Sequence, residues 1–151
     1  MTALSNEKII INNLNQAYDL VIEKASSARI NNDLQVSVDF IWKEENLTLL
    51  FEVDSYNAAK IIFGEYVLLN QVKSYKGNCI LVIIHCYKKY NIERTKKYLK
   101  FAEDNLKCKL PYVVFNYSEW HNLVNNLNKT ELVNFIKNKI KSNNQMICIQ
   151  K

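Results

Sequence analysis

One stretch of the chain, from Gln35 to Ser55, constrains the fold more than any other. Hydrophobic residues occupy every second position over residues 36–42 and again over residues 47–53, on either side of a charged segment at residues 43–46. Alternation with a period of two, in segments rich in β-branched and aromatic residues, is typical of β-strands. The sequence therefore predicts a β-hairpin here.

The turn of this hairpin fixes the pairing of its two strands. A two-residue turn at residues 45–46 pairs Glu44 with Leu47. The same register places Asp39 directly opposite Glu52. A slip of one residue would move Asp39 to the other face of the hairpin, so the register matters for any site built on it.

Three carboxylates gather on one face of the predicted hairpin. Glu52 and Asp54 share a face because they are two residues apart, Asp39 lies opposite Glu52, and Ser37 lies opposite Asp54. Opposed residues have Cβ atoms about 5 Å apart, and like charges at that distance destabilise a sheet. Hard cations such as Mg²⁺ bind carboxylate oxygens. The arrangement therefore predicts a site for Mg²⁺ or Mn²⁺.

The hairpin resembles the core of the PD-(D/E)XK nuclease superfamily, which has the restriction-endonuclease-like fold. The motif residues are Asp39 on the first strand and Glu52-Val53-Asp54 at the end of the second. The resemblance covers about residues 7–116 and implies the order α-β-β-α-β-α-β. The chain departs from the family pattern at two positions, since Val38 replaces the usual Pro and Asp54 the usual Lys.

The resemblance implies a phosphodiester hydrolase whose ion is held by Asp39 and Glu52, with the Val53 carbonyl as a further ligand. Asp54 would bind the ion or orient the attacking water. Lys60, six residues beyond Asp54, is the first candidate for a displaced catalytic lysine, although a lysine at a helix edge often only faces solvent.

The family often brings an acid from its first helix to the metal. Asp19 or Glu23 would be that acid here, unless each is an ordinary solvated residue.

The remaining pattern predicts a single α/β domain over residues 1–151, with a central mixed sheet of about four strands flanked by helices. Hydrophobic residues at helical spacing predict amphipathic helices, and short apolar runs rich in β-branched residues predict buried strands. The expected helices cover residues 6–29, 56–72, 91–106, a short segment from 118, and 130–141; the expected strands beyond the hairpin cover 79–86 and 110–115; residues 142–151 are expected to form a flexible tail.

Two surfaces are candidates for partners. The predicted helix over 56–72 is apolar around much of its circumference, which favours a homodimer. A basic group around the start of the helix over 91–106 is a candidate phosphate-contact surface, with a solvated face paired as Glu93–Lys97 and Lys100–Asp104 as the alternative. The basic group consists of Lys88, Lys89, Arg94, Lys96, Lys97 and Lys100.

Charge is divided unevenly along the chain. Residues 1–72 hold five Lys or Arg and ten Asp or Glu, whereas residues 73–151 hold fifteen and five. The first part thus carries −5 and the second +10. An acidic part with a carboxylate site and a basic part suit an enzyme that binds a polyanion such as DNA. A lysine- and asparagine-rich composition also arises from an AT-rich genome.

Several classes of protein are disfavoured. Two glycines leave no phosphate-binding loop of the Rossmann or P-loop type. Four cysteines without a CxxC pair and two distant histidines do not suit a zinc site. Unpaired core cysteines favour a reducing, cytoplasmic location. The sequence shows no signal peptide and no apolar run long enough to span a membrane.

The sequence therefore predicts a Mg²⁺- or Mn²⁺-dependent DNA endonuclease. Three alternatives stay open: a nucleic-acid-binding module of the same fold that does not cut, an assembly module, and a different α/β enzyme. Divalent-metal affinity separates the nuclease from an assembly module, and salt-sensitive DNA binding without turnover would indicate the first alternative.

Overall fold

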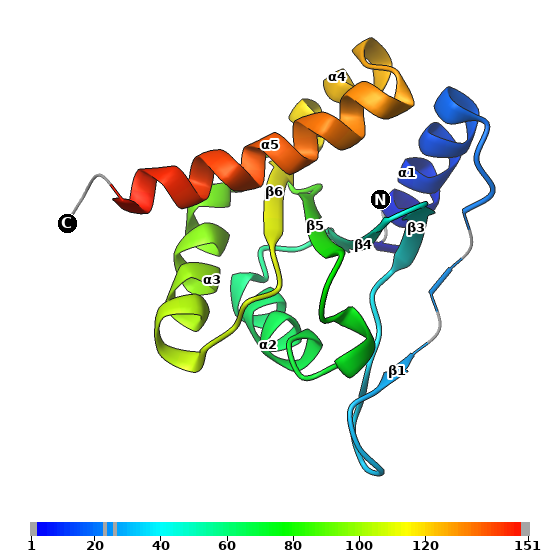
Figure 1. The fold of residues 1–151 in the computed structure, drawn as a ribbon. Helices are drawn as coiled ribbons and strands as arrows, with labels where there is room; N and C mark the ends of the chain where they lie inside the picture. Colours follow the sequence, from blue (N-terminus) through cyan, green and yellow to red (C-terminus); the bar gives the residue numbers. More distant parts are fainter. Residues whose placement is uncertain (1–2, 23, 26, 149–151) are drawn as a thin grey trace.

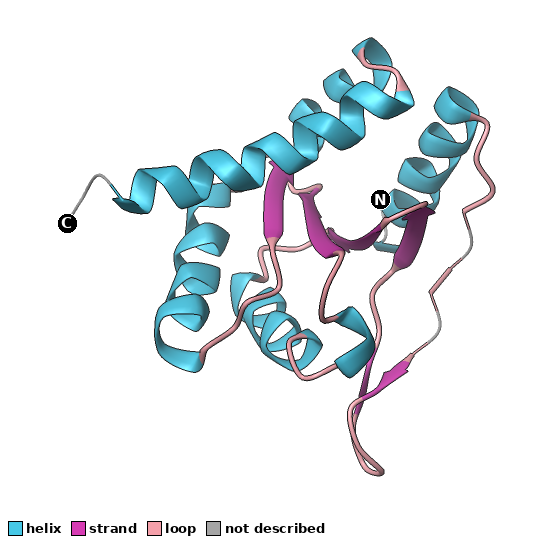
Figure 2. Cartoon of the chain, viewed as in Figure 1, coloured by secondary structure: helices cyan, strands magenta, loops and turns pink. Residues whose placement is uncertain are grey.

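A four-stranded sheet separates two groups of helices in the computed structural model, which describes residues 3–22, 24–25 and 27–148 (Figures 1 and 2). Helices α1, α4 and α5 lie on one side of the sheet, and α2 and α3 lie on the other. The expected α/β class with a mixed four-stranded sheet is confirmed. The elements are α1 Ala3–Tyr18, β1 Ala28–Arg29, β2 Gln35–Val36, β3 Phe40–Glu44, β4 Leu47–Asp54, α2 Ala59–Leu69, the 3-10 helix η1 Lys73–Tyr75, β5 Cys79–His85, α3 Ile92–Leu106, β6 Tyr112–Asn116, α4 Tyr117–Asn126 and α5 Lys129–Cys148.

The strands lie in the order β3-β4-β5-β6. β3 and β4 form the predicted antiparallel hairpin, and their register is the predicted one from Glu44–Leu47 to Phe40–Phe51. The other two pairings are parallel. The first strand of the hairpin is shorter than expected, because residues 35–36 leave the sheet and pair instead with β1 in a separate two-stranded sheet.

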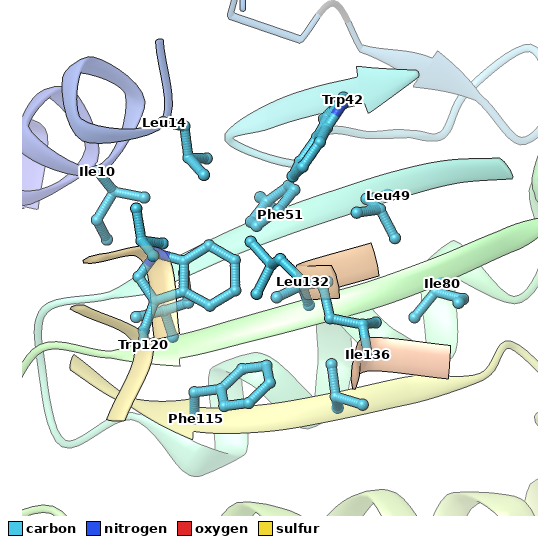
Figure 3. Packing of buried hydrophobic residues seen from close by; sticks show 14 of the residues in the cluster. Ile10, Leu14, Trp42, Leu49, Phe51, Ile80, Phe115, Trp120, Leu132 and Ile136 are labelled. Atoms are coloured by element: carbon cyan, nitrogen blue, oxygen red, sulfur yellow. The ribbon is translucent and has the colours of Figure 1, made fainter. Parts of the chain in front are cut away.

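β5 is the central strand that its apolar run predicts, since all seven of its residues are buried. The side chains of the sheet alternate between two hydrophobic clusters, one under each group of helices. Figure 3 shows the cluster on the α1, α4 and α5 side, where Phe51 and Phe115 pack around Trp120. Helices therefore cover both faces of the sheet, so a functional site has to lie at one of its edges or ends.

The first helix is shorter than predicted. α1 ends at Tyr18 rather than near residue 29, because Asp19 adopts a left-handed conformation with φ of 51°. The Asn15 side chain then accepts a hydrogen bond from the Ile22 amide at 3.1 Å, which turns the chain away from the helix axis. Val21, which continues the helical spacing of hydrophobic residues in the sequence, is 91% exposed as a result.

The other helices differ from expectation mainly at their ends. α2 occupies residues 59–69 of the predicted 56–72, and Leu106 at the end of α3 is exposed rather than inward. α5 continues to Cys148, beyond the predicted end at residue 141, since no Gly or Pro interrupts the chain there. Within the described ranges, no helix has both the length and the apolar character needed to cross a membrane.

Candidate functional site

The carboxyl ends of the parallel strands meet at one edge of the sheet. The register places Asp54, His85 and Asn116 side by side as the last residues of β4, β5 and β6. The chain then turns into α2, α3 and α4, so three helix N-termini face the same edge (Figure 1). In open α/β sheets, ligands bind beyond the carboxyl ends of the strands.

Asp39 stands at this edge, immediately before β3. Its backbone N–H donates to the Phe51 carbonyl at 2.9 Å, and its carboxylate accepts a hydrogen bond from the Val53 N–H at 2.7 Å. Phe51 already pairs with Phe40, so regular pairing of the hairpin ends there. The expected Ser37–Asp54 pair is therefore wrong, and Asp39 comes near Glu52 as an irregular extension of the strand.

Glu52 lies beside a second carboxyl group, Glu65 of α2. The two side chains share a hydrogen bond, and each has one carboxyl oxygen, Oε2, that is buried without a hydrogen-bond partner. Buried polar atoms normally have partners, and an exception calls for an unseen ligand or a functional role. Sequence reasoning missed Glu65, which lies between hydrophobic residues of an apolar helix.

Burial and like charge act together on these acids. Burial is the largest cause that raises the pKa of Glu52, to about 10, and the charges of Asp39 and Glu65 add to it. The pKa of Asp39 is also raised, mainly by burial, although the Val53 N–H opposes the shift. Burial likewise raises the pKa of Glu65, while the hydrogen bond from Glu52 lowers it. Burial and like charge therefore favour a proton on the Glu52–Glu65 pair.

A fourth acid reaches the site from α1. Glu7 is buried at the start of α1 and raises the pKa of Asp39 through its charge. We call Glu7, Asp39, Glu52 and Glu65 the carboxyl cluster. Asp19 is an exposed residue just beyond the opposite end of α1, which agrees with the alternative of an ordinary solvated residue; Glu23 lies outside the described residues.

Asp54 belongs to a different arrangement. Its Oδ2 lies 2.7 Å from His85 Nδ1, and its Oδ1 accepts a hydrogen bond from the Tyr56 N–H at 3.0 Å. His85 Nε2 lies 2.8 Å from Thr95 Oγ1. The Tyr90 hydroxyl also lies 2.8 Å from Thr95 Oγ1. Tyr90 also stacks on the His85 ring. Both oxygens of Asp54 therefore have protein partners, unlike those of an open metal ligand.

Two lysines are candidates for a cation beside the carboxyl cluster, Lys60 and Lys24. Lys60 is exposed at the start of α2, and no ion pair of its side chain occurs within the described part of the chain. Lys24, which sequence reasoning did not select, places its Nζ 3.8 Å from Glu7 Oε1. The signal for it was weak, since a lone lysine in a polar segment has no pattern.

The basic group at the start of α3 is partly neutralised. Lys96 pairs with Glu93 at 2.6 Å, and Lys100 pairs with Asp104 at 2.5 Å, so the expected Glu93–Lys97 pair is wrong. Lys96 takes that partner because residues three apart on a helix are also neighbours. The arginine of the group, Arg94, donates to Asn57 at 3.1 Å. Three exposed lysines of this group have no ion pair within the described ranges: Lys88, Lys89 and Lys97.

Two further observations limit what the site is and where it lies. Among the residues that the structure describes, no three His, Cys, Asp or Glu side chains are grouped closely enough to hold a metal ion. A hollow of about 530 Å³ opens at the other end of the sheet, between the ends of α2 and α3, and none of the carboxyl cluster lines it. The carboxyl ends of the strands therefore remain the candidate functional site.

The fold and the carboxyl cluster together define an α/β protein with an acidic site at the carboxyl edge of a mixed sheet. Comparisons of the chain with protein-family models, with curated proteins and with solved structures return no match.

Proposed function

We propose that the chain is a metal-dependent nuclease with a restriction-endonuclease-like core, which hydrolyses phosphodiester bonds of DNA. One observation carries the proposal: the Glu52 carboxyl has a buried oxygen without a partner, beside the acids Asp39 and Glu65. Such a group is costly for a fold to keep unless a ligand uses it. Carboxylate oxygens are the ligands that a divalent cation such as Mg²⁺ takes.

The donor chemistry fits Mg²⁺ or Mn²⁺. Asp39 and Glu52 would hold the ion, as the hairpin motif implies, and Glu65 offers a further carboxyl oxygen. When bound, the ion would lower the pKa of an attacking water and offset charge on the phosphate. Asp54 is better placed to support the site, because its partners His85 and Tyr56 hold the end of β4 in position.

Other features of this edge favour a phosphate substrate. The N-termini of α2, α3 and α4 face it, and helix N-termini attract anions. Lys88 and Lys89 lie three and four residues beyond the end of β5 and are exposed. They would hold the DNA backbone next to the carboxyl cluster, with an affinity that falls steeply with salt.

The test is cleavage of supercoiled plasmid, single-stranded DNA and a four-way junction in Mg²⁺ and Mn²⁺. Asp39→Asn and Glu52→Gln are expected to lower the rate at least about 100-fold. Asp33→Asn and Glu45→Gln are matched controls, because both residues are exposed and lie outside the carboxyl cluster. Cleavage that survives in the first pair of variants, or that is lost in all four, would refute the proposed site.

A second candidate is a DNA-binding module of the same fold that does not cut. The observation in its favour is Asp54, which stands where the motif has Lys and is bound to His85. This candidate predicts salt-sensitive binding of the same DNAs without turnover in either metal. Gel-shift assays run beside the cleavage assays separate the two.

A further inference from the structure

Lys24 approaches the carboxyl cluster from the side of α1. Its backbone pairs with Phe40 in a single antiparallel bridge, and the Ala25 N–H donates to the Asp39 carbonyl at 3.2 Å. These contacts hold the chain against the residues that begin β3. The side chain reaches Glu7, with Nζ 3.8 Å from Oε1.

The ion pair with Glu7 is weak, so the Lys24 ammonium group is able to bind another anion. A separation of 3.8 Å is long for an ion pair, and the Lys24 side chain is 67% exposed, whereas that of Glu7 is 10% exposed. Water screens such a pair, so it contributes little stability. The ammonium group is therefore able to leave Glu7 for a stronger anion. It also acts on Asp39, whose pKa is raised mainly by burial and is lowered by the Lys24 charge.

A phosphate group that approaches the carboxyl cluster needs positive charge beside it. Unlike charges near a protein surface attract by a few kcal/mol, and like charges repel equally, at about 4 Å. The hairpin motif supplies no cation, because its position 54 is an Asp bound to His85. Lys60 makes no ion pair within the described residues, with the cluster or elsewhere. Within the described part of the chain, Lys24 is the lysine that forms an ion pair with a member of the carboxyl cluster.

We propose that Lys24 contacts the substrate phosphate at the carboxyl cluster and stabilises the charge that develops on it during hydrolysis. The inference rests on the proposed function and names a catalytic residue for it. The strand bridge to Phe40 fixes the backbone of the lysine, and the exposed side chain supplies the reach. The ligand is the phosphodiester backbone of a nucleic acid.

The test compares Lys24→Gln and Lys24→Arg with two matched controls, Lys43→Gln and Lys73→Gln, which remove exposed lysines from β3 and η1. Cleavage of a labelled duplex oligonucleotide in Mn²⁺ gives kcat and KM, and fluorescence anisotropy in Ca²⁺ gives the Kd of the same duplex. Lys24→Gln is expected to lower kcat about 10- to 100-fold and to weaken the Kd more than about threefold, because the contact forms in the bound substrate and strengthens as charge develops on the phosphate. Lys24→Arg should recover part of the loss, and the controls should stay within about twofold of wild type.

The outcomes separate this inference from the proposed function. If the wild type cleaves and Lys24→Gln matches Lys43→Gln, the role of Lys24 is refuted and the nuclease stands. If the wild type does not cleave, the nuclease is refuted, and the Kd values decide whether Lys24 contacts a phosphate group. A Kd that is more than about threefold weaker for Lys24→Gln than for Lys43→Gln supports a phosphate contact. Equal Kd values, or no DNA binding by the wild type, refute it.

Discussion

At the level of single residues, Glu52 has the least favourable environment for its charged form. Its carboxyl group is held among Asp39, Glu65 and Asp54, and one of its oxygens is buried without a partner. A carboxylate in such a place is destabilised by lost hydration and by like charge, so the folded chain keeps Glu52 protonated. The same residue is thus a weak point of the fold, and under the proposed function a bound cation would offset its charge.

Glu52→Gln is expected to stabilise the metal-free protein at alkaline pH. The pKa of Glu52 rises from 4.5 to about 10 on folding, so between these values the folded chain holds a proton that the unfolded chain has lost. Stability therefore falls as pH rises through this window, by at most about 1.4 kcal/mol per pH unit for one proton. Gln cannot ionise, so the variant should show a flatter pH dependence and a higher Tm at pH 8.

Thermal melts from pH 5 to 9 in EDTA measure this dependence. Glu45→Gln is the matched control, because Glu45 is exposed in the hairpin turn, and it should follow the wild type. Parallel curves for Glu52→Gln and the wild type would show that Glu52 ionises normally in the folded protein.

The hairpin part of the site could be predicted from sequence and the rest could not. Asp39 and Glu52 follow from a local register, which alternation and a tight turn determine. Glu7 and Glu65 come from helices on opposite sides of the sheet, and nothing local says that they converge. The signal for Glu65 is an acid among the hydrophobic residues of a helix, which indicates burial but not a partner; Glu7, between Asn6 and Lys8, has no such signal.

At the level of elements, a buried hydrogen-bonded chain joins β4, β5 and α3. It runs from Asp54 through His85 to Thr95 and then to Tyr90, which lies in the loop before α3. Asp54 and His85 are almost fully buried as a pair. A buried ion or hydrogen-bonded pair holds elements in one arrangement, and the loss of one member leaves the other unsatisfied.

Variants along this chain are expected to show graded losses of stability. His85→Ala leaves Asp54 buried without its side-chain partner and should lower the free energy of unfolding by about 3–5 kcal/mol. Thr95→Val and Tyr90→Phe remove outer links and should each cost about 1 kcal/mol. Urea denaturation measures these values, with His121→Ala at an exposed histidine as control. A cost for His85→Ala no larger than for His121→Ala would contradict a structural role for the pair.

The extent of each element was predictable where hydrophobic pattern and end signals agree. β5 is buried on both faces as its apolar run indicates, and Asn91 begins α3 by accepting a hydrogen bond from the Glu93 N–H. α1 was overextended because Val21 continues the helical pattern, whereas a left-handed Asp19 ends the helix. Tertiary contacts determine such a turn, and the spacing of hydrophobic residues gives no information about them.

The whole molecule separates its charges between the first and second parts of the sequence. Residues 1–72 carry −5 and include every member of the carboxyl cluster, while residues 73–151 carry +10. The fold brings the two parts together at the carboxyl edge, where Lys88 and Lys89 follow β5 next to the end of β4. A polyanion bound there would meet free lysines first, and its phosphates would then lie close to the acids.

The salt dependence of DNA binding tests this arrangement. Each lysine that contacts a phosphate adds about one to the slope of log K against log salt concentration, because it releases a condensed counterion. The double variant Lys88→Gln/Lys89→Gln is therefore expected to reduce the slope by about two. Lys96→Gln/Lys100→Gln is the matched control with equal charge loss, and it should change the slope less, since both lysines are engaged with Glu93 and Asp104.

Fluorescence anisotropy with a labelled duplex in Ca²⁺, between about 50 and 200 mM salt, gives both slopes. Equal changes in the two double variants would mean that net charge alone attracts DNA, with no contact surface beside the carboxyl cluster. A larger change in the control variant would show that the DNA contact surface lies on the exposed side of α3. A slope near zero for the wild type would exclude a phosphate partner and favour the assembly module. A reduced slope for Lys88→Gln/Lys89→Gln alone would place the DNA backbone at the edge where Asp39 and Glu52 lie.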